Sequence, residues 1–574
     1  MDRIMEILDA FPIDFSNVYI ALLRIIAPVL MGVILWRAGR PLLSFRKEPE
    51  IWALLRLADG TNLPVTHWEN IIGSHPRSDL VLPVSTVSRN HAVLTRYDDG
   101  SWTITDAESQ NGVKVNGRKV DIYALEPEDV IDLGGVRMRL EPITAEQEKR
   151  LAQLRTRASS GLTSFINVLL LTMFQAMCCL AFLVNGDGEH IFDILLGFGG
   201  ICAAQWAVLI FYACIRRSAF EVETIAFFLC TMGMNVIAAT VPGEAVKQLI
   251  ALGLGLGVFF AVGWSLRDLE RAKLFRYGAT AAGILFLVIT LLFGKEIYGA
   301  KNWLVLGGFS IQPSELSKLC FVYVGASTMD RIMKKRNIIG FIAYSVVLCG
   351  LLALMNDFGT ALIFFVAFLA IAYMRSGSVG TIGLAVTSLG FAGVIALKIA
   401  PHALRRFSIW RHIWEDPLGR GYQQTRCLMC MASGGLLGLG AGNGWMKKLF
   451  ASDTDVVFAT VAEEWGLIAA LVMVAAVVVL AAFCLRAASL GRSSFYTIGA
   501  CTAASILLAQ TILNVMGTID LLPFTGVTFP FVSNGGSSLI SAWGLMAFVK
   551  AADTRLDASF AIRRTTKKNR EVTE

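Results

Sequence analysis

The sequence predicts an α-helical polytopic membrane protein of about thirteen transmembrane helices, with an all-β domain inserted after the first helix. The chain has 574 residues, of which 55% are hydrophobic and only 17% are charged, whereas soluble domains are roughly one quarter charged. Its mean hydropathy is +0.60. Apolar windows long enough to cross a bilayer recur along the chain, and one polar island interrupts them. Lipid is therefore the expected solvent for most of this protein.

Thirteen apolar windows have the length of a membrane span, and those that are short or contain glycine are tolerated when packed against other spans. They lie near residues 17–36, 162–185, 191–215, 223–241, 247–265, 277–293, 314–329, 339–355, 358–374, 379–398, 459–485, 497–518 and 530–550. Together with the polar island they predict an N-terminal transmembrane anchor (1–45), a β-domain (50–143), a linker helix with two transmembrane helices (144–220), a membrane core of about ten helices (221–552) and a basic tail (553–574).

Basic clusters set the predicted orientation, because Lys and Arg favour the cytoplasmic side of a membrane. They follow every second span, at residues 216–220, 267–276, 330–337, 486–492 and 563–570. We therefore expect the β-domain and the C-terminus in the cytoplasm, and the N-terminus and segment 399–458 outside. The formal charge of +7 is concentrated in such clusters. No basic face with interleaved aromatics indicates a nucleic-acid partner.

The polar island has the pattern of a β-sandwich, in which alternating runs such as "WTITD" and "VKVNG" are separated by Gly, Asp and Asn. Three motifs follow in order, "IIGSHPRSDLVLP", "VSRNHAVL" and "DAESQNGVKVNG". In these motifs the island resembles the forkhead-associated (FHA) domain. The resemblance implies a phosphothreonine pocket lined by Ser88, Arg89, Gln110 and Asn111, with His91 bracing the loops.

One residue departs from the FHA pattern. Where the family usually has Gly-Arg, this sequence has Gly73-Ser74, which removes a guanidinium that often clamps the phosphate. Arg77 follows three residues later and is a candidate substitute. Two interpretations remain open: a domain that reads phosphothreonine, and a sandwich that binds a partner without reading phosphate.

From about residue 220 onward, four blocks are similar to one family of polytopic cell-wall proteins. They are "GAKNWLVLGGFSIQPSELSKL" (299–319), "NDFGTALI" (356–363), "DPLGRGYQQTRCLMCMASGGLLGLGAGNG" (416–444) with "TDVVFATVAEEWG" (454–466), and "LLPFTGVTFPFVSNGGSSLIS" (521–541). By these blocks the chain resembles the SEDS family (shape, elongation, division and sporulation), the FtsW/RodA/SpoVE group. The resemblance implies polymerisation of lipid II into glycan strands. It also implies a class B penicillin-binding protein as partner, because this chain lacks a transpeptidase signature.

The resemblance places one catalytic carboxylate in a Thr-Asp pair that precedes a helix with Glu-Glu. Asp455 of "TDVVFA" holds that position. In the implied reaction a sugar hydroxyl attacks an anomeric carbon, and a carboxylate can accept its proton as a general base. Asp453 is expected to cap the following helix. Glu463 and Glu464 lie further along that helix, where at least one must face the interior or find a partner.

The polar residues of the same blocks predict the substrate site. Glu315 and Lys318 stand three apart at the start of a span, where they can form a structural ion pair, line a cavity for a lipid headgroup, or do both. The Gly-rich stretches are either packing glycines or donors of backbone N–H groups to pyrophosphate. Arginines of the exterior loop suit an anionic lipid-linked substrate. The predicted substrate-binding residues are Glu315, Lys318, Arg406, Gln423, Ser433, Gly434, Gly435, Ser533, Gly535, Gly536 and Ser537.

The sequence predicts no definite cofactor. It contains no Walker or dinucleotide fingerprint. Cys427 and Cys430 form a CxxC with no second pair and no histidine at zinc spacing, so no metal or redox site is predicted there. A divalent cation at the pyrophosphate is left open.

Two other functions fit parts of the sequence. Many spans around a polar midplane also describe a transporter of the lipid-linked precursor, although no clear inverted repeat relates the halves. A non-catalytic scaffold, whose FHA domain recruits phosphorylated proteins, is disfavoured by Asp455 at the family position. Two departures concern the geometry of the site: "LFASDTD" is shorter than usual and lacks a His, and Asn534 stands where the family usually has Tyr.

Overall fold

The structure is a computed structural model of the chain. It describes residues 13–44, 51–76, 78–97, 100–144, 146, 158–185, 189–267, 269–297, 300–306, 309–329, 335–376, 379–399, 401–488, 493–555 and 557–560. Its helices are α2 (Ile13–Leu43), α4 (Gly161–Asn185), α5 (Ile191–Cys214), α6 (Glu221–Thr240), α7 (Ala245–Ser265), α8 (Leu269–Phe293), α9 (Pro313–Met329), α10 (Lys335–Leu354), α11 (Phe358–Ser376), α12 (Val379–Ile399), α13 (Pro401–Ile409), α14 (Tyr422–Gly434), α15 (Val457–Glu464), α16 (Gly466–Ala488), α17 (Ser494–Thr518) and α18 (Gly536–Ala551).

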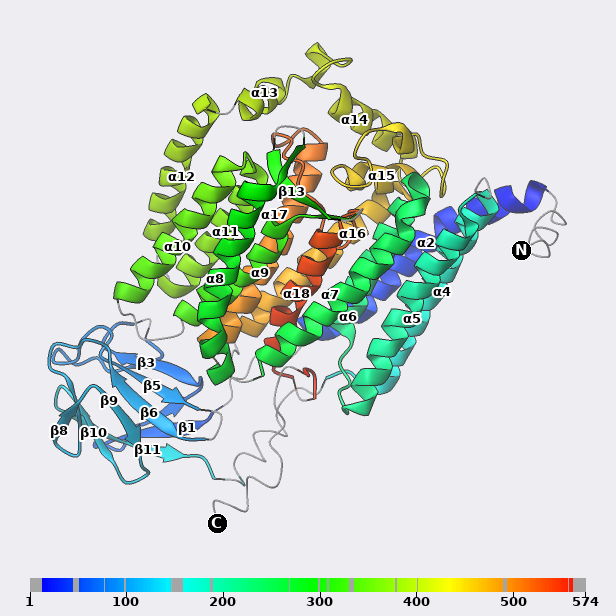
Figure 1. The fold of residues 1–574 in the computed structure, drawn as a ribbon. Coiled ribbons are helices and arrows are strands. Elements are labelled where there is room, and N and C mark those ends of the chain that lie inside the picture. Colours follow the sequence, from blue (N-terminus) through cyan, green and yellow to red (C-terminus); the bar gives the residue numbers. More distant parts are fainter. Residues whose placement is uncertain are drawn as a thin grey trace.

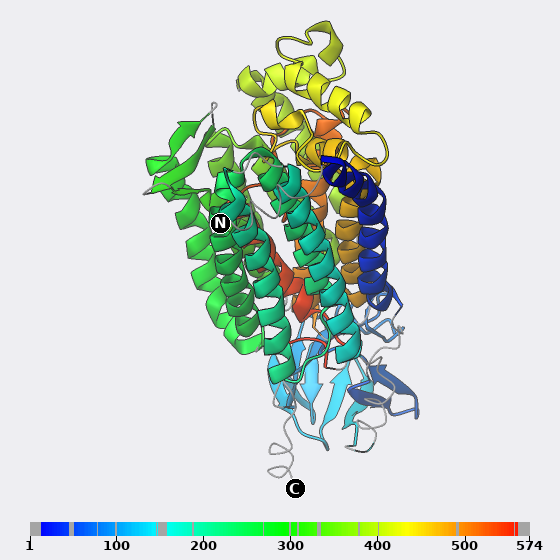
Figure 2. The same ribbon diagram turned by 90° about the vertical axis from the view of Figure 1, so that its right-hand side faces the viewer.

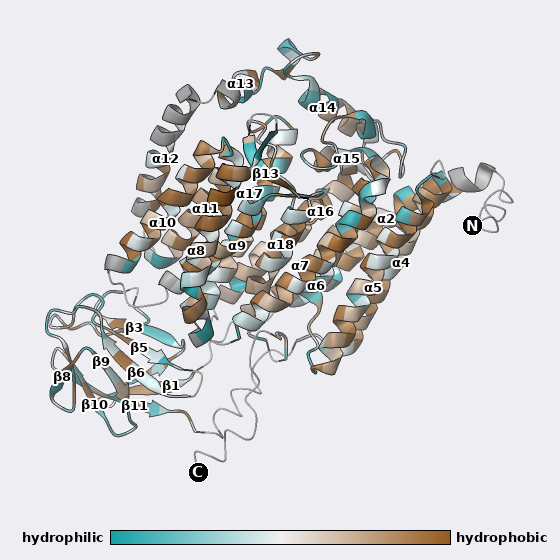
Figure 3. Ribbon diagram, viewed as in Figure 1, coloured by the Kyte–Doolittle hydropathy of each residue, from teal (hydrophilic) through white to brown (hydrophobic). Residues whose placement is uncertain are grey.

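Each predicted apolar window coincides with a helix, and the window at 459–485 is shared by α15 and α16. Within the described residues, ten helices are long and apolar enough to cross a membrane, so this is a multi-pass membrane protein. The predicted number of about thirteen is higher because windows also fall on α9, α12 and α18. Of these, α9 and α18 have only 17 and 16 residues, whereas a span needs about 20. In Figure 3, where the ribbon is coloured by hydropathy, hydrophobic residues predominate along the long bundle helices.

The polar island forms the predicted β-sandwich. One sheet has the strand order β2-β1-β11-β10-β7-β8, and the other has β4-β3-β5-β6-β9. Leu55, Leu94, Ile104 and Ile131 from the two sheets are fully buried in one apolar core. The strands are β1 (Ala53–Leu57), β2 (Asn62–Val65), β3 (Glu69–Gly73), β4 (Leu80–Val81), β5 (Ala92–Arg96), β6 (Trp102–Asp106), β7 (Val113–Val115), β8 (Arg118–Val120), β9 (Ile122–Leu125), β10 (Val130–Leu133) and β11 (Val136–Pro142).

The helical bundle has two different ends, which Figures 1 and 2 show from two sides. The β-sandwich and the C-terminal end of α18 lie at one end, here named the sandwich end. The other, named the loop end, carries α13, α14, α15, residues 519–535 and a small sheet of β12 (Lys295–Ile297), β13 (Ala300–Leu306) and β14 (Phe309–Ile311). The sandwich contacts the bundle through Glu69, whose Oε2 accepts a hydrogen bond of 2.5 Å from Ser494 Oγ at the start of α17.

Helix α6 is buried along its whole length and supports the loop end from inside the bundle. A Cβ at Gly233 of this helix would stand 2.7 Å from Val532 O and 2.8 Å from Phe531 O. Only a glycine lets the segment between α17 and α18 approach the helix so closely.

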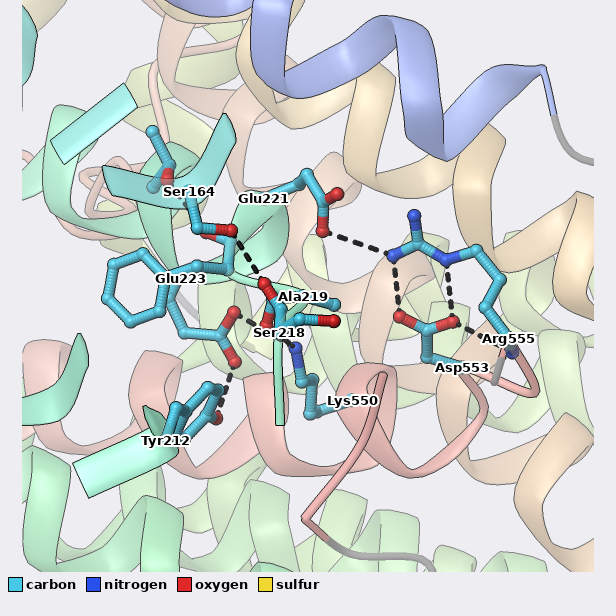
Figure 4. A network of polar contacts seen from close by, with 11 residues as sticks. Ser164, Tyr212, Ser218, Ala219, Glu221, Glu223, Lys550, Asp553 and Arg555 are labelled. Atoms are coloured by element: carbon cyan, nitrogen blue, oxygen red, sulfur yellow. Dashed lines mark hydrogen bonds and ion pairs between the residues drawn. The ribbon is translucent and has the colours of Figure 1, made fainter. Parts of the chain in front are cut away.

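Ion pairs buried at the sandwich end join the first and last helices of the bundle core (Figure 4). Lys550 Nζ of α18 lies 3.0 Å from Glu223 Oε2 of α6, and Tyr212 of α5 donates to Glu223 Oε1 at 2.7 Å. All three side chains are buried. Because a charge removed from water must be paired, these contacts fix the relative positions of the three helices.

A second group in Figure 4 extends the network beyond α18. Arg555 Nη2 lies 2.7 Å from Asp553 Oδ2 and 3.2 Å from Glu221 Oε2 of α6, and all three side chains are buried. The chain after α18 is therefore anchored under the start of α6.

Candidate active site

Asp455 lies at the loop end, in the turn between the 3-10 helix η3 (Met446–Lys448) and α15. Its backbone N–H donates to Ala451 O at 3.0 Å. Its carbonyl oxygen accepts a hydrogen bond of 2.8 Å from Nδ2 of Asn514, and the same nitrogen donates to Val527 O at 2.9 Å. One side chain of α17 thus fixes the Asp455 turn against the segment that follows α17.

The Asp455 carboxylate lies against Gly526. A Cβ at Gly526 would stand 3.1 Å from Asp455 Oδ2 and 3.9 Å from Arg406 Nη1. The φ of +67° at Gly526 also favours glycine. Arg406 reaches the same segment from α13, because its Nη1 donates to Thr525 O at 2.9 Å. A carboxylate and a guanidinium therefore meet at a residue that has no side chain.

Burial raises the pKa of Asp455 to about 6. The hydrogen bond from the Thr454 side chain and the positive charge of Arg406 oppose this shift, whereas the negative charge of Asp453 adds to it. A carboxyl group with this pKa is mostly ionised at neutral pH, yet binds a proton more tightly than an ordinary aspartate. This is the property that a general base near neutral pH requires.

Asp453 does not cap α15, so the predicted role is wrong. The residue that precedes the helix is Val456, and its side chain makes no capping bond. Asp453 instead accepts hydrogen bonds from Asn534, whose backbone N–H lies 2.8 Å from Asp453 O and whose Nδ2 lies 2.9 Å from Oδ2. The Asn that replaces the usual Tyr thereby ties the Asp455 turn to the start of α18.

Two more predicted substrate residues contact the same turn. Ser533 Oγ donates to Thr454 O at 2.5 Å, and it accepts the N–H of Phe529 at 2.8 Å. Gln423 of α14 donates from Nε2 to Phe450 O at 3.1 Å. With Arg406, these residues reach the Asp455 turn and its neighbouring segment from three separate parts of the chain.

Glu463 and Glu464 are both buried and bind the loop that precedes η3. Glu463 accepts the backbone N–H groups of Trp445 and Met446 at 3.0 and 2.8 Å. Glu464 Oε2 accepts the N–H of Gly442 at 3.2 Å. The expectation that at least one of the two faces the interior or finds a partner is confirmed. Both carboxylates bind backbone N–H groups of this loop.

Ser433, Gly434 and Gly435 lie where α14 ends and packs against α15. A Cβ at Gly434 would stand 2.4 Å from Ala462 O. The N–H of Gly435 donates to Met431 O at 3.2 Å, and Ser433 Oγ donates to the helix backbone at 2.7 Å. These contacts favour the alternative of packing glycines, because the polar groups are used within the protein.

Gly535, Gly536 and Ser537 form the start of α18. Ser537 Oγ accepts the backbone N–H of Gln312 at 3.0 Å, and Gln312 Nε2 donates to Asp357 Oδ2 at 3.2 Å. Ser537 of block 521–541 is thus joined to Gln312 of block 299–319 and, through it, to Asp357 of block 356–363.

Glu315 and Lys318 form the predicted structural ion pair on α9. Glu315 Oε2 lies 2.7 Å from Lys318 Nζ, and the two side chains are only 7% and 1% exposed. Ser541 of α18 donates to Glu315 O at 2.8 Å. The ion pair lies within α9, and the Ser541 hydrogen bond joins this helix to α18.

Asn514 and Gly526 position Asp455 and were not predicted from the sequence. Asn514 stands in the apolar run "QTILNVMG", and a polar residue inside a span is itself a signal of function or packing. Gly526 belongs to a matched block, but its closeness to Asp455 depends on the tertiary structure.

The four predicted phosphopeptide residues lie on neighbouring loops of the sandwich. Ser88 Oγ accepts the backbone N–H of Gln110 at 3.0 Å. Asn111 Nδ2 donates to Thr86 O at 2.7 Å. Ser88 is partly exposed, and the other three are exposed. Residues with a hydroxyl, two side-chain amides and a guanidinium thus belong to adjoining loops, and these are groups that suit a phosphate.

His91 is buried beneath these loops and makes the bracing contacts expected of it. Its Nδ1 accepts the N–H of Ser88 at 3.0 Å, and its Nε2 lies 3.2 Å from Gly112 O. Ser74 adjoins the same loops, because its N–H donates to Ser88 O at 3.0 Å. Arg77, the candidate substitute for the missing arginine, lies outside the described residues.

Cys427 and Cys430 are free and buried. They pack in an apolar cluster with Met446, Leu449 and Val456, which agrees with a packing role. Within the described part of the chain, no group of three or more His, Cys, Asp or Glu side chains is arranged to hold a metal ion.

The fold and the site define a polytopic membrane protein with a candidate catalytic carboxylate at one end of its bundle and a β-sandwich at the other. Residues 219–557 match the FtsW/RodA/SpoVE family model, described as cell cycle protein, and residues 70–134 match the FHA domain model. Because the first match spans more than half of the chain, this protein belongs to the FtsW/RodA/SpoVE family, and it carries an FHA domain.

Similar proteins include the peptidoglycan glycosyltransferase RodA of Mycobacterium tuberculosis, which is 30% identical over 53% of this chain and 69% of its own. The probable peptidoglycan glycosyltransferase FtsW of Tolumonas auensis is 34% identical over 55% of this chain and 84% of its own. A chain from a solved peptidoglycan synthase complex has 26% identity and a TM-score of 0.50, with coverage of 57% of this chain and 96% of that chain.

Proposed function

We propose that this protein is a peptidoglycan glycosyltransferase that polymerises lipid II into glycan strands. The observation that carries the proposal is the environment of Asp455, whose burial raises its pKa to about 6 and whose carboxylate lies beside Arg406 at the loop end. Membership of the family and the names of the similar proteins support the same activity.

Asp455 acts as the general base of this reaction. A sugar hydroxyl of one substrate attacks the anomeric carbon of the other, and the glycosidic bond forms as the bond to the polyprenyl pyrophosphate breaks. The hydroxyl proton passes to Asp455. The leaving pyrophosphate carries its own negative charge, so it requires cations and N–H groups instead of a protein acid. Arg406 supplies a cation at this place.

We assign substrate binding to the groups that surround the Asp455 turn. These are Arg406, Gln423 and Ser533, which contact the turn or its neighbouring segment. Residues 535–537 directly follow Ser533 and Asn534 in the sequence and are included with them. The pair on α9 and the glycines at the end of α14 then have structural roles, because the pair is buried within one helix and Gly434 packs against the α15 backbone.

We place the sandwich end in the cytoplasm and the loop end, with Asp455, outside the cell. Basic residues at the sandwich end support this orientation: Arg40, Arg375 and Arg486 lie in the last turns of α2, α11 and α16. The proposed parts are a transmembrane anchor (1–45), an FHA domain (50–143), a linker with two further spans (144–220), a glycosyltransferase core (221–552) and a basic tail (553–574).

We assign two protein partners. The FHA domain binds a phosphothreonine-containing protein through Ser88, Arg89, Gln110 and Asn111, in support of which these residues lie on adjoining loops of the sandwich. The core works with a class B penicillin-binding protein, which supplies the crosslinking that this chain does not. The similarity to a chain of a peptidoglycan synthase complex supports such a pairing.

The test is polymerisation of purified lipid II by the purified full chain in detergent, with and without the partner transpeptidase. Glycan strands made by the wild type and lost in the Asp455→Asn variant are the expected result. A wild-type chain that moves lipid II across vesicle membranes and makes no glycan would instead identify a transporter.

A further inference from the structure

Of the three helices outside the family-matched region, α2 and α4 reach the loop that leads to Asp455. α2, α4 and α5 precede residue 219, and α2 packs between α4 and α16. At the loop end, Asn185 is the last residue of α4. Its Nδ2 donates to Ala441 O at 2.7 Å and to Asn443 Oδ1 at 2.8 Å. A residue of an additional helix is thus bonded to the Gly-rich loop of the family core.

The loop at residues 440–446 is held from two sides. On one side a Cβ at Gly440 would stand 2.5 Å from Cγ2 of Ile20 on α2, so that helix lies directly against the loop backbone. On the other side, Glu463 and Glu464 of α15 accept backbone N–H groups of the loop. Without α2 and α4, the contacts of Ile20 and Asn185 with this loop would be lost.

A small cavity at the same contact brings a charge of α2 toward α15. It is lined by Arg24 together with Glu464 and Trp465. Among the described residues, neither Arg24 Nε nor Trp465 Nε1 has a hydrogen-bond partner, although both atoms are buried. The guanidinium of α2 therefore shares an enclosed space with one of the two carboxylates that hold the loop.

The loop is connected to the Asp455 turn through η3 and through an apolar cluster that both contribute to. It runs into η3, where Met446 and Leu449 are buried in one apolar cluster with Val456 and Ala459. Val456 directly follows Asp455. Close-packed interiors transmit small displacements, so a shift of the loop would carry η3 and the Asp455 turn with it.

We propose that Asn185 is a positioning residue for glycosyl transfer, which anchors residues 440–446 so that Asp455 stays in its productive place. The inference rests on the proposed function, because it assumes that Asp455 is the base. Loss of the anchor leaves the loop free to move by fractions of an ångström, and a misplacement of about 1 Å can lower turnover about a hundredfold. Asn185 acts through the loop and touches no reacting atom.

The experiment compares kcat and KM for lipid II polymerisation by full-length Asn185→Ala and Asn185→Asp. The Asp variant has the same shape but cannot donate to Ala441 O. Asn167→Ala is the matched control, because Asn167 is also on α4 and also makes a hydrogen bond to another segment, but away from the loop: it accepts from Arg37 Nε of α2 at 3.0 Å. We expect kcat to fall about ten- to a hundredfold in both Asn185 variants with KM changed less than about threefold, and kcat to stay near wild type in Asn167→Ala.

Three outcomes distinguish the positioning role of Asn185 from the proposed glycosyltransferase function. If Asn185→Asp unfolds with the wild-type melting temperature but turns over slowly, the positioning role is supported. If both Asn185 variants keep wild-type kcat, or if Asn167→Ala loses as much, the inference is wrong while the proposed function stands. If the wild type makes no glycan under conditions in which a control polymerase does, the proposed function fails and the inference fails with it.

Discussion

Asn514 donates one hydrogen bond of 2.8 Å to the carbonyl oxygen of Asp455 and another of 2.9 Å to Val527 O. Its Oδ1 is buried and has no partner within the described residues, so only the donor half of the amide is used. The first of these bonds spans 59 positions of sequence. The place of the candidate base therefore depends on a helix that contributes nothing to the chemistry.

Replacing Asn514 with Asp should lower polymerisation sharply, because the donor is exchanged for an oxygen that faces two carbonyl oxygens. We expect kcat to fall about a hundredfold, the loss associated with a small misplacement of a catalytic group. Lipid II turnover at saturating substrate measures this change. Thr511→Val, on the same helix, removes only a hydrogen bond to Leu507 O within that helix. Equal turnover in the two variants would contradict the positioning role of Asn514.

Replacing Asp455 with Asn should abolish general-base catalysis and preserve the fold. The amide keeps the shape of the side chain but has no basic oxygen, so polymerisation should fall about 10²- to 10⁴-fold. Asp453→Asn is the control: its partner Asn534 remains, and turnover should change far less. A gel assay of glycan strands from purified lipid II makes the comparison, and near wild-type synthesis by Asp455→Asn would refute the assignment.

The pH dependence of polymerisation should show an acid limb near pH 6. Asp455 must be ionised to accept a proton, so kcat/KM should rise as pH passes through its raised pKa of about 6. The positive charge of Arg406 opposes that raised pKa, so Arg406→Gln should move the limb to higher pH. Rates of lipid II consumption between pH 5 and 8 measure both effects. A limb that stays in place in Arg406→Gln would show that another group titrates.

The same pKa has a consequence for stability. The pKa of Asp455 in the folded protein lies above its ordinary value of 3.8, so the native state binds this proton more tightly than the unfolded chain does. Native stability from this group is therefore lost as pH rises from about 4 to above 6. Asp455→Asn should accordingly melt at least as high as the wild type at pH 8.

The membrane bundle and the sandwich could be predicted because both depend on local patterns. Apolar length marks a span, and alternation with turn residues marks a strand. The break between α15 and α16 could not be predicted in this way. It depends on Gly466, which has a φ of +87° and at which a Cβ would stand 2.2 Å from Leu436 O. That contact joins segments that are distant in the sequence, so the periodicity of the apolar residues cannot predict it.

In the candidate site, too, local patterns could be predicted from the sequence, whereas contacts between distant segments could not. Asp455 could be proposed as the base because a motif carries its position, whereas the capping role predicted for Asp453 is wrong because helix capping is a local rule. The Asp453 side chain instead accepts a hydrogen bond from Asn534, which is distant in the sequence. Helix α15 begins only after Val456. Gly526 and Asn514 could not be predicted for a related reason. Their contacts with Asp455 join residues that are distant in the sequence.

Phosphopeptide binding should depend on Arg89. A phosphothreonine peptide should bind the full chain more tightly than its unmodified form, and Arg89→Ala should remove most of that difference, since a charge-assisted contact contributes about 1.5 to 3 kcal/mol. Arg56→Ala is the control, because Arg56 is also an exposed arginine of the sandwich and pairs with Glu141 at 3.3 Å. Fluorescence anisotropy with a phosphopeptide library measures both. Equal affinity for modified and unmodified peptides would leave a sandwich that does not read phosphate.

Replacing Arg555 with Met should destabilise the bundle more than any exposed charge change. Arg555 is the shared partner of Asp553 and Glu221 at 2.7 and 3.2 Å, and all three side chains are buried. Removing the cation leaves two carboxylates in a low-dielectric interior, and breaking such a buried pair costs about 3 to 5 kcal/mol. Thermal unfolding in detergent should show a clearly lower melting temperature.

Lys247→Met is the matched control for Arg555→Met, because it also breaks a close ion pair. Lys247 Nζ lies 2.6 Å from Glu244 Oε1, but the two side chains are 50% and 39% exposed, and exposed pairs contribute at most about 1 kcal/mol. If the network locks the chain after α18 under α6, Arg555→Met should melt well below Lys247→Met. Asp553→Asn in the Arg555→Met background should recover part of the loss, because one of the two unpaired carboxylates is then removed. Equal melting temperatures for the two single variants would mean that the buried network does not hold the sandwich end together.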